Sequence, residues 1–190
     1  MTTATRDHLL TAAEALVRSR GYAAFSYADL AGIVGVSKPT IHHHFSTKED
    51  LGVALVASYT ERFDTRLAAI AEAMPAASDR LRAYADLYLA GLRDERACLC
   101  AMLASDHAAV PERVRIGVAA FMERNLRWLD QVIRDGVDDG QLVADLNSRT
   151  EAEAFYAALV GAMFAARSLG RLDTFEVVAA RSIDRLGAAA

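Results

Sequence analysis

The chain has 190 residues, of which 53% are apolar, and its formal net charge is −4 at pH 7. So many apolar residues exclude a disordered chain, while the longest apolar run, residues 154–166, is shorter than the roughly 18–20 residues that a membrane span needs. Its two cysteines, Cys98 and Cys100, form no disulfide framework and are typical of a reducing compartment. We therefore expect a soluble cytoplasmic protein with no membrane partner.

Helical periodicity predicts the first two elements. Apolar residues recur with helical spacing from Leu9 onward, and Gly21 follows two arginines, which is typical of a helix C-terminus. Ser26 and Asp29 then form a capping-box pattern that opens a short second helix. Gly35 interrupts this helix and begins a turn.

A third short helix is predicted over residues 38–44. Ser37 is a strong N-cap candidate, and Pro39 falls in the first turn, where a missing N–H group is tolerated. Ile41 is the core residue of this helix, and Phe45 closes it. Two short helices joined by a glycine-centred turn are the helix-turn-helix pattern, in which the second helix enters the major groove of DNA.

The rest of the chain predicts longer helices. Ser46 and Glu49 form another capping-box pattern, which opens a helix over residues 47–74 that Pro75 ends. Further helices are predicted over residues 78–93, 97–108, 111–138, 150–170 and 173–186, and no segment alternates like a strand. The predicted fold class is therefore all-α.

Several short motifs stand at fixed spacing between Leu9 and Leu51. They are Ala12-Ala13, Gly21-Tyr22, Asp29-Leu30-Ala31, Gly35-Val36-Ser37, Thr40-Ile41, His44-Phe45 and Lys48-Glu49-x-Leu51. With these motifs the segment resembles the DNA-binding domain of tetracycline-repressor-type (TetR) transcriptional regulators. The resemblance covers about a quarter of the chain, and the remainder matches the family in length and helical character only.

The resemblance implies a DNA-binding domain in residues 1–50 and a helical ligand-binding and dimerisation domain in residues 51–190. It implies a homodimeric repressor that binds a pseudo-palindromic operator on double-stranded DNA and is released by an unknown small-molecule inducer. It implies no cofactor and no enzymatic activity. An enzyme is one alternative, although the chain has no HExxH motif and no phosphate-binding loop. A decayed helix-turn-helix that no longer binds DNA is another, and the intact Lys38, Thr40 and Lys48 argue against it.

Three consecutive histidines, His42–His44, raise the question of a metal site. Successive helical residues lie about 100° apart, and chelation from one helix needs i, i+4 spacing, so the triplet argues against a metal site. Imidazoles also donate hydrogen bonds to phosphate oxygens or to base edges. The predicted DNA-binding residues are Ser37, Lys38, Pro39, Thr40, His42, His43 and Lys48.

Lys48, in the first turn of a helix, is predicted to bind phosphate; the alternative is a solvated lysine paired with Glu49 or Asp50. His42 and His43 stand where members of the resembled family often have tyrosines, and a tyrosine at position 42 would be expected to touch phosphate. We therefore hypothesise that DNA affinity rises as the pH falls from about 8 to about 6, since a histidine gains its charge near pH 6.5.

Side chains of the second region predict an inducer pocket, although most aromatic residues in helices are simply core. The pocket candidates are Tyr84, Tyr88, Met102, His107, Asn125 and Trp128. The eighth predicted helix is apolar almost all round, which predicts a four-helix bundle between two subunits or, alternatively, two faces that serve the subunit's own core. The interface candidates are Phe155, Ala157, Val160, Gly161, Phe164, Ser168, Phe175, Ala179 and Ser182.

The two cysteines raise redox sensing. On one helix Cys98 and Cys100 would lie about 200° apart, which suits neither a disulfide nor shared metal ligation. We expect both to be buried thiols that act as small apolar groups.

Overall fold

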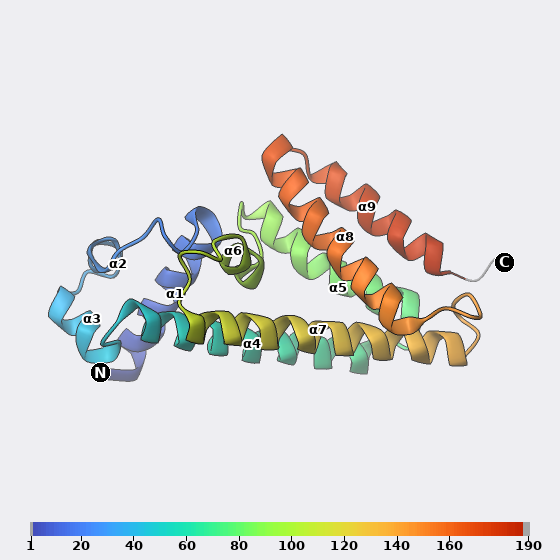
Figure 1. Cartoon of the computed structure of the whole chain (residues 1–190), viewed down its shortest axis with the longest axis horizontal. Helices are drawn as coiled ribbons and strands as arrows, with labels where there is room; N and C mark the ends of the chain where they lie inside the picture. Colours follow the sequence, from blue (N-terminus) through green and yellow to red (C-terminus); the bar gives the residue numbers. More distant parts are fainter. Residues whose placement is uncertain (1, 188–190) are drawn as a thin grey trace. The chain divides into compact units, whose positions relative to one another are not determined.

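The computed structural model describes residues 2–187. Within this range the chain folds into nine α-helices and no strand (Figure 1). Their bounds are α1 Thr2–Arg20, α2 Tyr27–Val34, α3 Lys38–His44, α4 Lys48–Ala73, α5 Ala77–Arg93, α6 Leu99–Ser105, α7 Glu112–Asp138, α8 Ser148–Leu169 and α9 Leu172–Leu186. The all-α prediction is confirmed. No helix among the described residues is both long and apolar enough to cross a membrane.

Capping residues correctly predict where α1 ends and where α2 and α3 begin. α1 ends at Arg20, and Gly21 follows with a φ of 90°, in the left-handed region that favours glycine. At α2, the Asp29 amide donates to Ser26 Oγ and the Ser26 amide donates to Asp29 Oδ2 at 2.7 Å, so the capping box is present. α2 ends at Gly35, and the side chain of Ser37 caps α3 by accepting from the Thr40 amide at 3.3 Å.

The predicted capping box of α4 was wrong by one residue. The amide and hydroxyl of Thr47 donate to Asp50 Oδ2 at 3.2 and 2.8 Å, and the Asp50 amide donates to Thr47 Oγ1 at 3.0 Å. Thr47 and Asp50 therefore form the box that was predicted for Ser46 and Glu49. The two overlapping pairs satisfy the same spacing rule, so the pattern alone does not choose between them.

α6 is shorter than the predicted helix over residues 97–108, because it covers only Leu99–Ser105. Cys98 has an extended backbone (φ −60°, ψ 131°) and stands at the N-cap position. Asp106 follows the last residue of the helix, and its carboxylate accepts a hydrogen bond from the Tyr22 amide, which is distant in the sequence. Helical propensity could not predict this ending, since its cause is a tertiary contact.

The chain divides into two compact units. The first comprises residues up to Arg62 together with Cys98–Phe121, and the second comprises Phe63–Ala97 and the chain from Met122 onward. α4 and α7 each contribute residues to both units. The units follow spatial contacts, whereas the predicted boundary at residue 50 concerns function and stays a prediction.

Each unit has its own apolar core. In the first unit, Leu9, Leu30, Ile41 and Leu51 are fully buried and bring α1, α2, α3 and the start of α4 together. In the second unit, α5, α8 and α9 lie side by side (Figure 1). Its core is built around large aromatic side chains of these helices. They are Tyr84, Tyr88, Phe155 and Phe175.

Candidate nucleic-acid interface

α3 has one buried face and one exposed face. Ile41 is 0% exposed and Phe45, which caps the C-terminus, is 3% exposed, so these two side chains hold α3 against the first unit. The other face carries most of the predicted DNA-binding residues. Ser37, Lys38, Pro39, His42 and His43 are exposed, while Thr40 is half-buried.

Ser37 and Thr40 form a local pair at the start of α3. Their hydroxyl oxygens lie 2.8 Å apart, in addition to the capping bond from the Thr40 amide to Ser37 Oγ. Ser37 is therefore a helix cap, as predicted, and its hydroxyl is oriented by a neighbour. Both hydroxyl groups lie beside the exposed Lys38, at the end of α3 whose residues contact base edges in a helix-turn-helix.

The three histidines have different surroundings. The Nδ1 atom of His42 lies 3.0 Å from the carbonyl oxygen of Ser46, and its ring packs edge-on against Tyr27 with centroids 4.9 Å apart. The rings of His43 and His44 meet at a centroid distance of 5.4 Å. The described part of the chain contains no cluster of three or more His, Cys, Asp or Glu side chains that could hold a metal ion.

Tyr27 ties α2 to the junction between α3 and α4. Its hydroxyl donates to the carbonyl oxygens of Phe45 at 2.9 Å and Thr47 at 2.6 Å. Burial raises the pKa of Tyr27 to about 12, and the nearby charge of Asp50 adds to this effect. The hydroxyl therefore stays protonated at any physiological pH, and its one hydrogen is shared between the two carbonyl oxygens.

Lys48 is held inside the first unit. Its Nζ donates to the carbonyl oxygens of Tyr22 at 2.7 Å and Phe25 at 2.6 Å, and it lies 4.5 and 4.3 Å from the centroids of these two rings. Burial lowers the pKa of Lys48, against the opposing charges of Asp29 and Asp106. An ammonium has three N–H groups, so one remains beyond these two bonds.

The alternative for Lys48, a solvated ammonium paired with Glu49 or Asp50, does not describe this half-buried position. Asp50 instead accepts from Thr47 and from Arg113, whose Nη1 lies 3.1 Å from Asp50 Oδ1. Sequence reasoning missed the attachment of Lys48 to the connector between α1 and α2. The signal was available in part, because Tyr22 and Phe25 stand in that connector and aromatic faces attract cations.

The same connector, residues 21–25, is also held by α6. The Tyr22 amide donates to Asp106 Oδ2 at 2.6 Å and the Ala23 amide lies 3.4 Å from it, while the Tyr22 hydroxyl donates to the Lys48 carbonyl at 3.0 Å. Burial is the main cause that raises the pKa of Tyr22 to about 12. The connector that leads into the helix-turn-helix is thus fixed by α4 and by α6.

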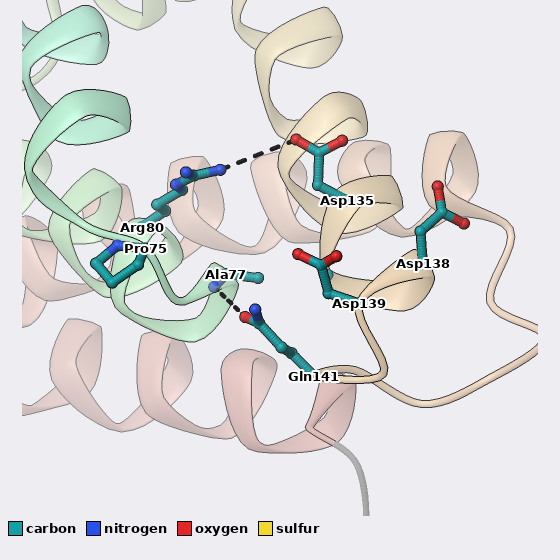
Figure 2. Close-up of a pocket in the computed structure, with 8 residues that line it drawn as sticks. Pro75, Ala77, Arg80, Asp135, Asp138, Asp139 and Gln141 are labelled. Carbon is teal, nitrogen blue, oxygen red and sulfur yellow. Dashed lines mark hydrogen bonds and ion pairs between the residues drawn. The ribbon is translucent and has the colours of Figure 1, made fainter.

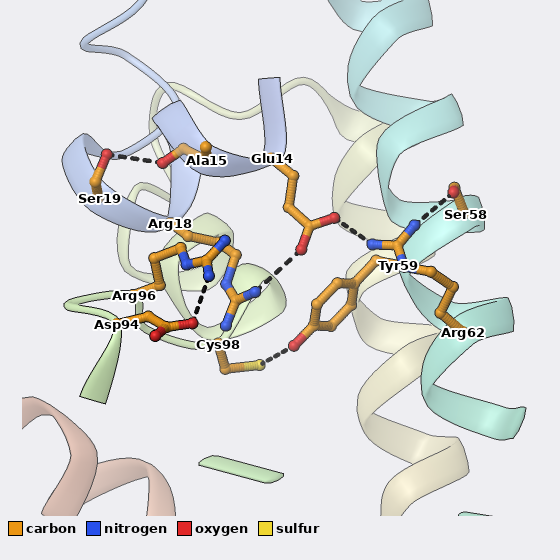
Figure 3. Close-up of polar contacts among 10 residues, drawn as sticks. All are labelled: Glu14, Ala15, Arg18, Ser19, Ser58, Tyr59, Arg62, Asp94, Arg96 and Cys98. Atoms are coloured by element: carbon orange, nitrogen blue, oxygen red, sulfur yellow. Dashed lines mark hydrogen bonds and ion pairs between the residues drawn. The ribbon is translucent and has the colours of Figure 1, made fainter. Parts of the chain in front are cut away.

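A further cation, Arg6, lies near α3 and was not predicted. Its guanidinium carbon is 5.2 Å from the ring centroid of Phe45, the residue that ends α3, and the side chain is exposed. Arg18 is engaged elsewhere, because it pairs with Glu14 at 3.0 Å (Figure 3). Glu14 also pairs with Arg62, so these charges join α1 to α4 and do not belong to the α3 surface.

Four of the six predicted pocket residues come together in the second unit. The Tyr84 hydroxyl donates to Asn125 Oδ1 at 2.8 Å and lies 3.3 Å from the Tyr88 hydroxyl, and the Tyr84 ring stacks on Trp128 with centroids 5.6 Å apart. Tyr84 is 0% and Asn125 1% exposed. The other two predicted pocket residues, Met102 and His107, belong to the first unit, and His107 is exposed.

A separate surface pocket of about 350 Å³ lies in the second unit (Figure 2). Its lining contains none of the predicted pocket residues, and two of its polar side chains, Arg80 and Gln141, bind backbone groups. Arg80 Nε donates to the Met74 carbonyl at 2.7 Å, and Gln141 Oε1 accepts from the Ala77 amide at 2.8 Å. The pocket is lined by Pro75, Ala77, Arg80, Asp135, Gly136, Asp138, Asp139 and Gln141.

The predicted interface residues fall on two different faces. Phe155, Phe175 and Ala179 are buried within the subunit itself, and their assignment to an interface between subunits stays a prediction. The remaining six are exposed or half-exposed and lie on the outward faces of α8 and α9. They are Ala157, Val160, Gly161, Phe164, Ser168 and Ser182. Helical spacing grouped the right residues on each face but could not tell which face the subunit covers.

Both cysteines are free and buried, as expected for small apolar groups. The Tyr59 hydroxyl lies 3.6 Å from Cys98 Sγ (Figure 3), and burial raises the pKa of the Cys100 thiol well above its usual range. The thiol of Cys100 is therefore protonated and poorly nucleophilic at neutral pH.

Comparisons with known proteins match the chain to bacterial transcriptional regulators. A family model described as bacterial regulatory proteins, tetR family, matches residues 9–55, and one described as tetracyclin repressor-like, C-terminal domain, matches residues 77–181. The chain is 32% identical to the HTH-type transcriptional regulator CymR of Pseudomonas putida over 72% of this chain and 70% of CymR. It is 25% identical to the HTH-type transcriptional repressor NemR of Escherichia coli K12 over 86% of this chain and 84% of NemR.

A solved structure shares the whole fold. The crystal structure of a TetR family transcriptional regulator from Agrobacterium tumefaciens superposes with a TM-score of 0.95 at 33% sequence identity. The match covers 99% of this chain and 100% of that chain.

Proposed function

The chain belongs to the tetR family of bacterial regulatory proteins, and on that premise we propose that it is a homodimeric repressor that a small-molecule inducer releases from its operator. Residues 1–50 form the DNA-binding domain and residues 51–190 the ligand-binding and dimerisation domain. The protein works in the cytoplasm on double-stranded DNA, and it needs no cofactor and catalyses no reaction. We propose repression because relatives such as NemR are transcriptional repressors.

The exposed face of α3 is the observation that carries DNA binding. Ile41 and Phe45 hold the helix, so Lys38, Pro39, His42 and His43 face outward together. A two-fold dimer presents two such faces, and therefore the operator is a pseudo-palindrome. Selection from a random duplex library, followed by gel shifts, tests this proposal. We expect an enriched sequence with two-fold symmetry, and enrichment of no sequence would overturn it.

We expect Lys48→Ala to weaken DNA binding on all sequences alike. The salt slope, which is the slope of log affinity against log salt concentration, should fall by about one unit for each subunit of the dimer. The third N–H of the ammonium, beside the N-terminus of α4, donates to a backbone phosphate. Fluorescence anisotropy over a series of salt concentrations measures the slope.

Asp106→Ala is the matched control for Lys48→Ala. It loosens the same connector, because Asp106 accepts from the Tyr22 amide, but it removes no cation. Its salt slope should stay that of the wild type. A slope that is also unchanged in Lys48→Ala would mean that Lys48 only holds the connector and binds no phosphate.

We expect His43→Ala to change base preference, affinity or both, because His43 is exposed on α3. Library selection with the variant gives the preference, and gel shifts on the wild-type operator give the affinity. His107→Ala, at an exposed histidine away from α3, is the control. Unchanged binding on every sequence would remove His43 from the set of contacts.

We place the inducer beside Tyr84, Tyr88, Asn125 and Trp128, whose hydroxyl and amide groups lie among aromatic rings in the second unit. A buried polar group within apolar walls is the combination that orients a small ligand. Met102 and His107 were also predicted for this pocket, but they belong to the other unit. Asn125→Leu tests the placement, since it should abolish release by an inducer while operator binding persists.

A further inference from the structure

His42 is held in one tautomer. Its Nδ1 atom lies 3.0 Å from the Ser46 carbonyl oxygen. A carbonyl oxygen accepts hydrogen bonds and cannot donate them, so Nδ1 carries the proton. The edge-on contact with Tyr27 fixes the plane of the ring, and Tyr27 itself is fixed by its bonds to the Phe45 and Thr47 carbonyls.

This tautomer determines whether the other ring nitrogen of His42, Nε2, donates or accepts hydrogen bonds. In a neutral imidazole with its proton on Nδ1, Nε2 has a lone pair and no hydrogen. Neutral His42 therefore presents an acceptor to solvent, which cannot bind a phosphate oxygen. A second proton enters at Nε2, and the ring then presents a cationic donor while keeping its bond to Ser46.

The ring lies beside the N-terminus of a long helix. Ser46, the acceptor of the Nδ1 bond, immediately precedes Thr47, which caps the 26 residues of α4. The free amides and the dipole at such an end favour an anion. His42 is exposed, so an anion at this end of α4 lies next to its outer edge.

The fixed charges around His42 are largely held in internal contacts. The first turn of α4 carries Lys48 and the carboxylates Glu49 and Asp50. The Lys48 ammonium donates to the Tyr22 and Phe25 carbonyls. The Asp50 carboxylate accepts from Thr47 and Arg113.

The other elements at this place add little fixed charge. On α2, Tyr27 keeps its hydroxyl proton because its pKa is raised to about 12, and Asp29 is bonded to Ser26. On α3, Lys38 is one turn away, and the remaining titratable neighbours are His43 and His44. Protonation of His42 therefore makes the surface around α3 and the N-terminus of α4 substantially more positive.

We propose that His42 is a proton-controlled phosphate contact, absent when the imidazole is neutral and formed by Nε2–H when it is protonated. The proposal rests on the proposed binding of operator DNA and specifies how pH regulates it. Because the complex with DNA contains the protonated imidazole of His42, the protein takes up protons from solution when it binds DNA. Affinity therefore rises as the pH falls.

The test measures DNA affinity at pH 6 and pH 8 over a series of salt concentrations, by anisotropy of a labelled duplex that covers the DNA upstream of the protein's own gene. For the wild type we expect roughly tenfold tighter binding at the lower pH, which is the size of the contribution from one hydrogen bond to a charged group. The salt slope should also steepen by about 2, since each phosphate contact contributes about 0.9 and a dimer has two copies of His42.

His42→Tyr supplies a hydroxyl donor at both pH values, and His42→Gln supplies a side chain that does not titrate. Both variants should lose most of the pH dependence, while His107→Gln, at an exposed histidine away from α3, should keep it. Equal pH dependence in wild type and His42→Gln, or its loss in His107→Gln alone, would overturn the role of His42. If the wild type binds at neither pH, the proposed function fails first and this inference falls with it.

A second measurement needs no DNA. Long-range ¹⁵N–¹H correlation spectra of the full chain at pH 8 distinguish the two neutral tautomers of each histidine. We expect His42 to carry its proton on Nδ1. A neutral ring protonated on Nε2 would contradict the premise, because Nε2–H would then be a donor at every pH.

Discussion

Replacing Ala157 or Gly161 with arginine should convert the proposed dimer into monomers. Operator binding should then weaken by roughly 10²-fold to 10⁴-fold, the gain that linking two binding modules typically provides. Ala157 and Gly161 are exposed on the outward face of α8. A Cβ added at Gly161 meets no atom within 4 Å, so the subunit itself has room for a larger side chain. In a two-fold interface, the same arginine meets its own copy or a small residue across the axis, where it is too large and unpaired.

Sedimentation velocity gives the mass, and a gel shift on the selected operator gives the affinity. Ala90→Arg is the matched control, since it makes the same exchange at an exposed position of α5 in the same unit. It should remain a dimer with wild-type affinity. A dimer that survives Ala157→Arg and Gly161→Arg alike would remove this face of α8 from the interface.

The helix-turn-helix was predictable because its local rules agree with its packing. Ser26, Gly35 and Ser37 each satisfy a rule that concerns neighbours within a few residues, and the structure follows them. Ile41 was predictable as the core residue of α3 because it is the one large aliphatic side chain in a helix of seven residues. The structure of such a segment can be predicted from its sequence because helix caps, apolar spacing and burial all agree.

Contacts between distant segments were not predictable. Lys48 and Asp106 are both charged and would ordinarily face water, yet both bind backbone groups of residues 21–25. Nothing within a few residues of either one indicates this partner. The same limit applies to α8, where two apolar faces have similar composition. Phe155 faces the core and Phe164 is half-exposed because of how α5, α8 and α9 pack.

Replacing Gly21 with alanine should destabilise the first unit by about 3 kcal/mol or more, and should weaken DNA binding with it. The backbone at Gly21 has a φ of 90°, where an L side chain costs about 1–2 kcal/mol. A Cβ here would lie 2.6 Å from Asp106 Oδ2, so the carboxylate must move. Its bonds to the Tyr22 and Ala23 amides are then lost, and a hydrogen bond to a charged group contributes about 1.5–3 kcal/mol.

Gly35→Ala separates these two causes. Gly35 also has a positive φ, 72°, but a Cβ added there meets nothing within 4 Å, so this variant should show the backbone strain alone. Amide hydrogen exchange of α2 and α3 in the full chain measures the loss of local stability in both variants.

The double variant Gly21→Ala/Asp106→Ala should be little less stable than Gly21→Ala, because the carboxylate contact is already lost in the single variant. Equal losses in Gly21→Ala and Gly35→Ala would show that the contact between Asp106 and the connector contributes nothing. If instead the difference is present and DNA affinity falls in step with it, then the carboxylate of Asp106, at the C-terminus of α6, sets the position from which α2 and α3 reach the operator.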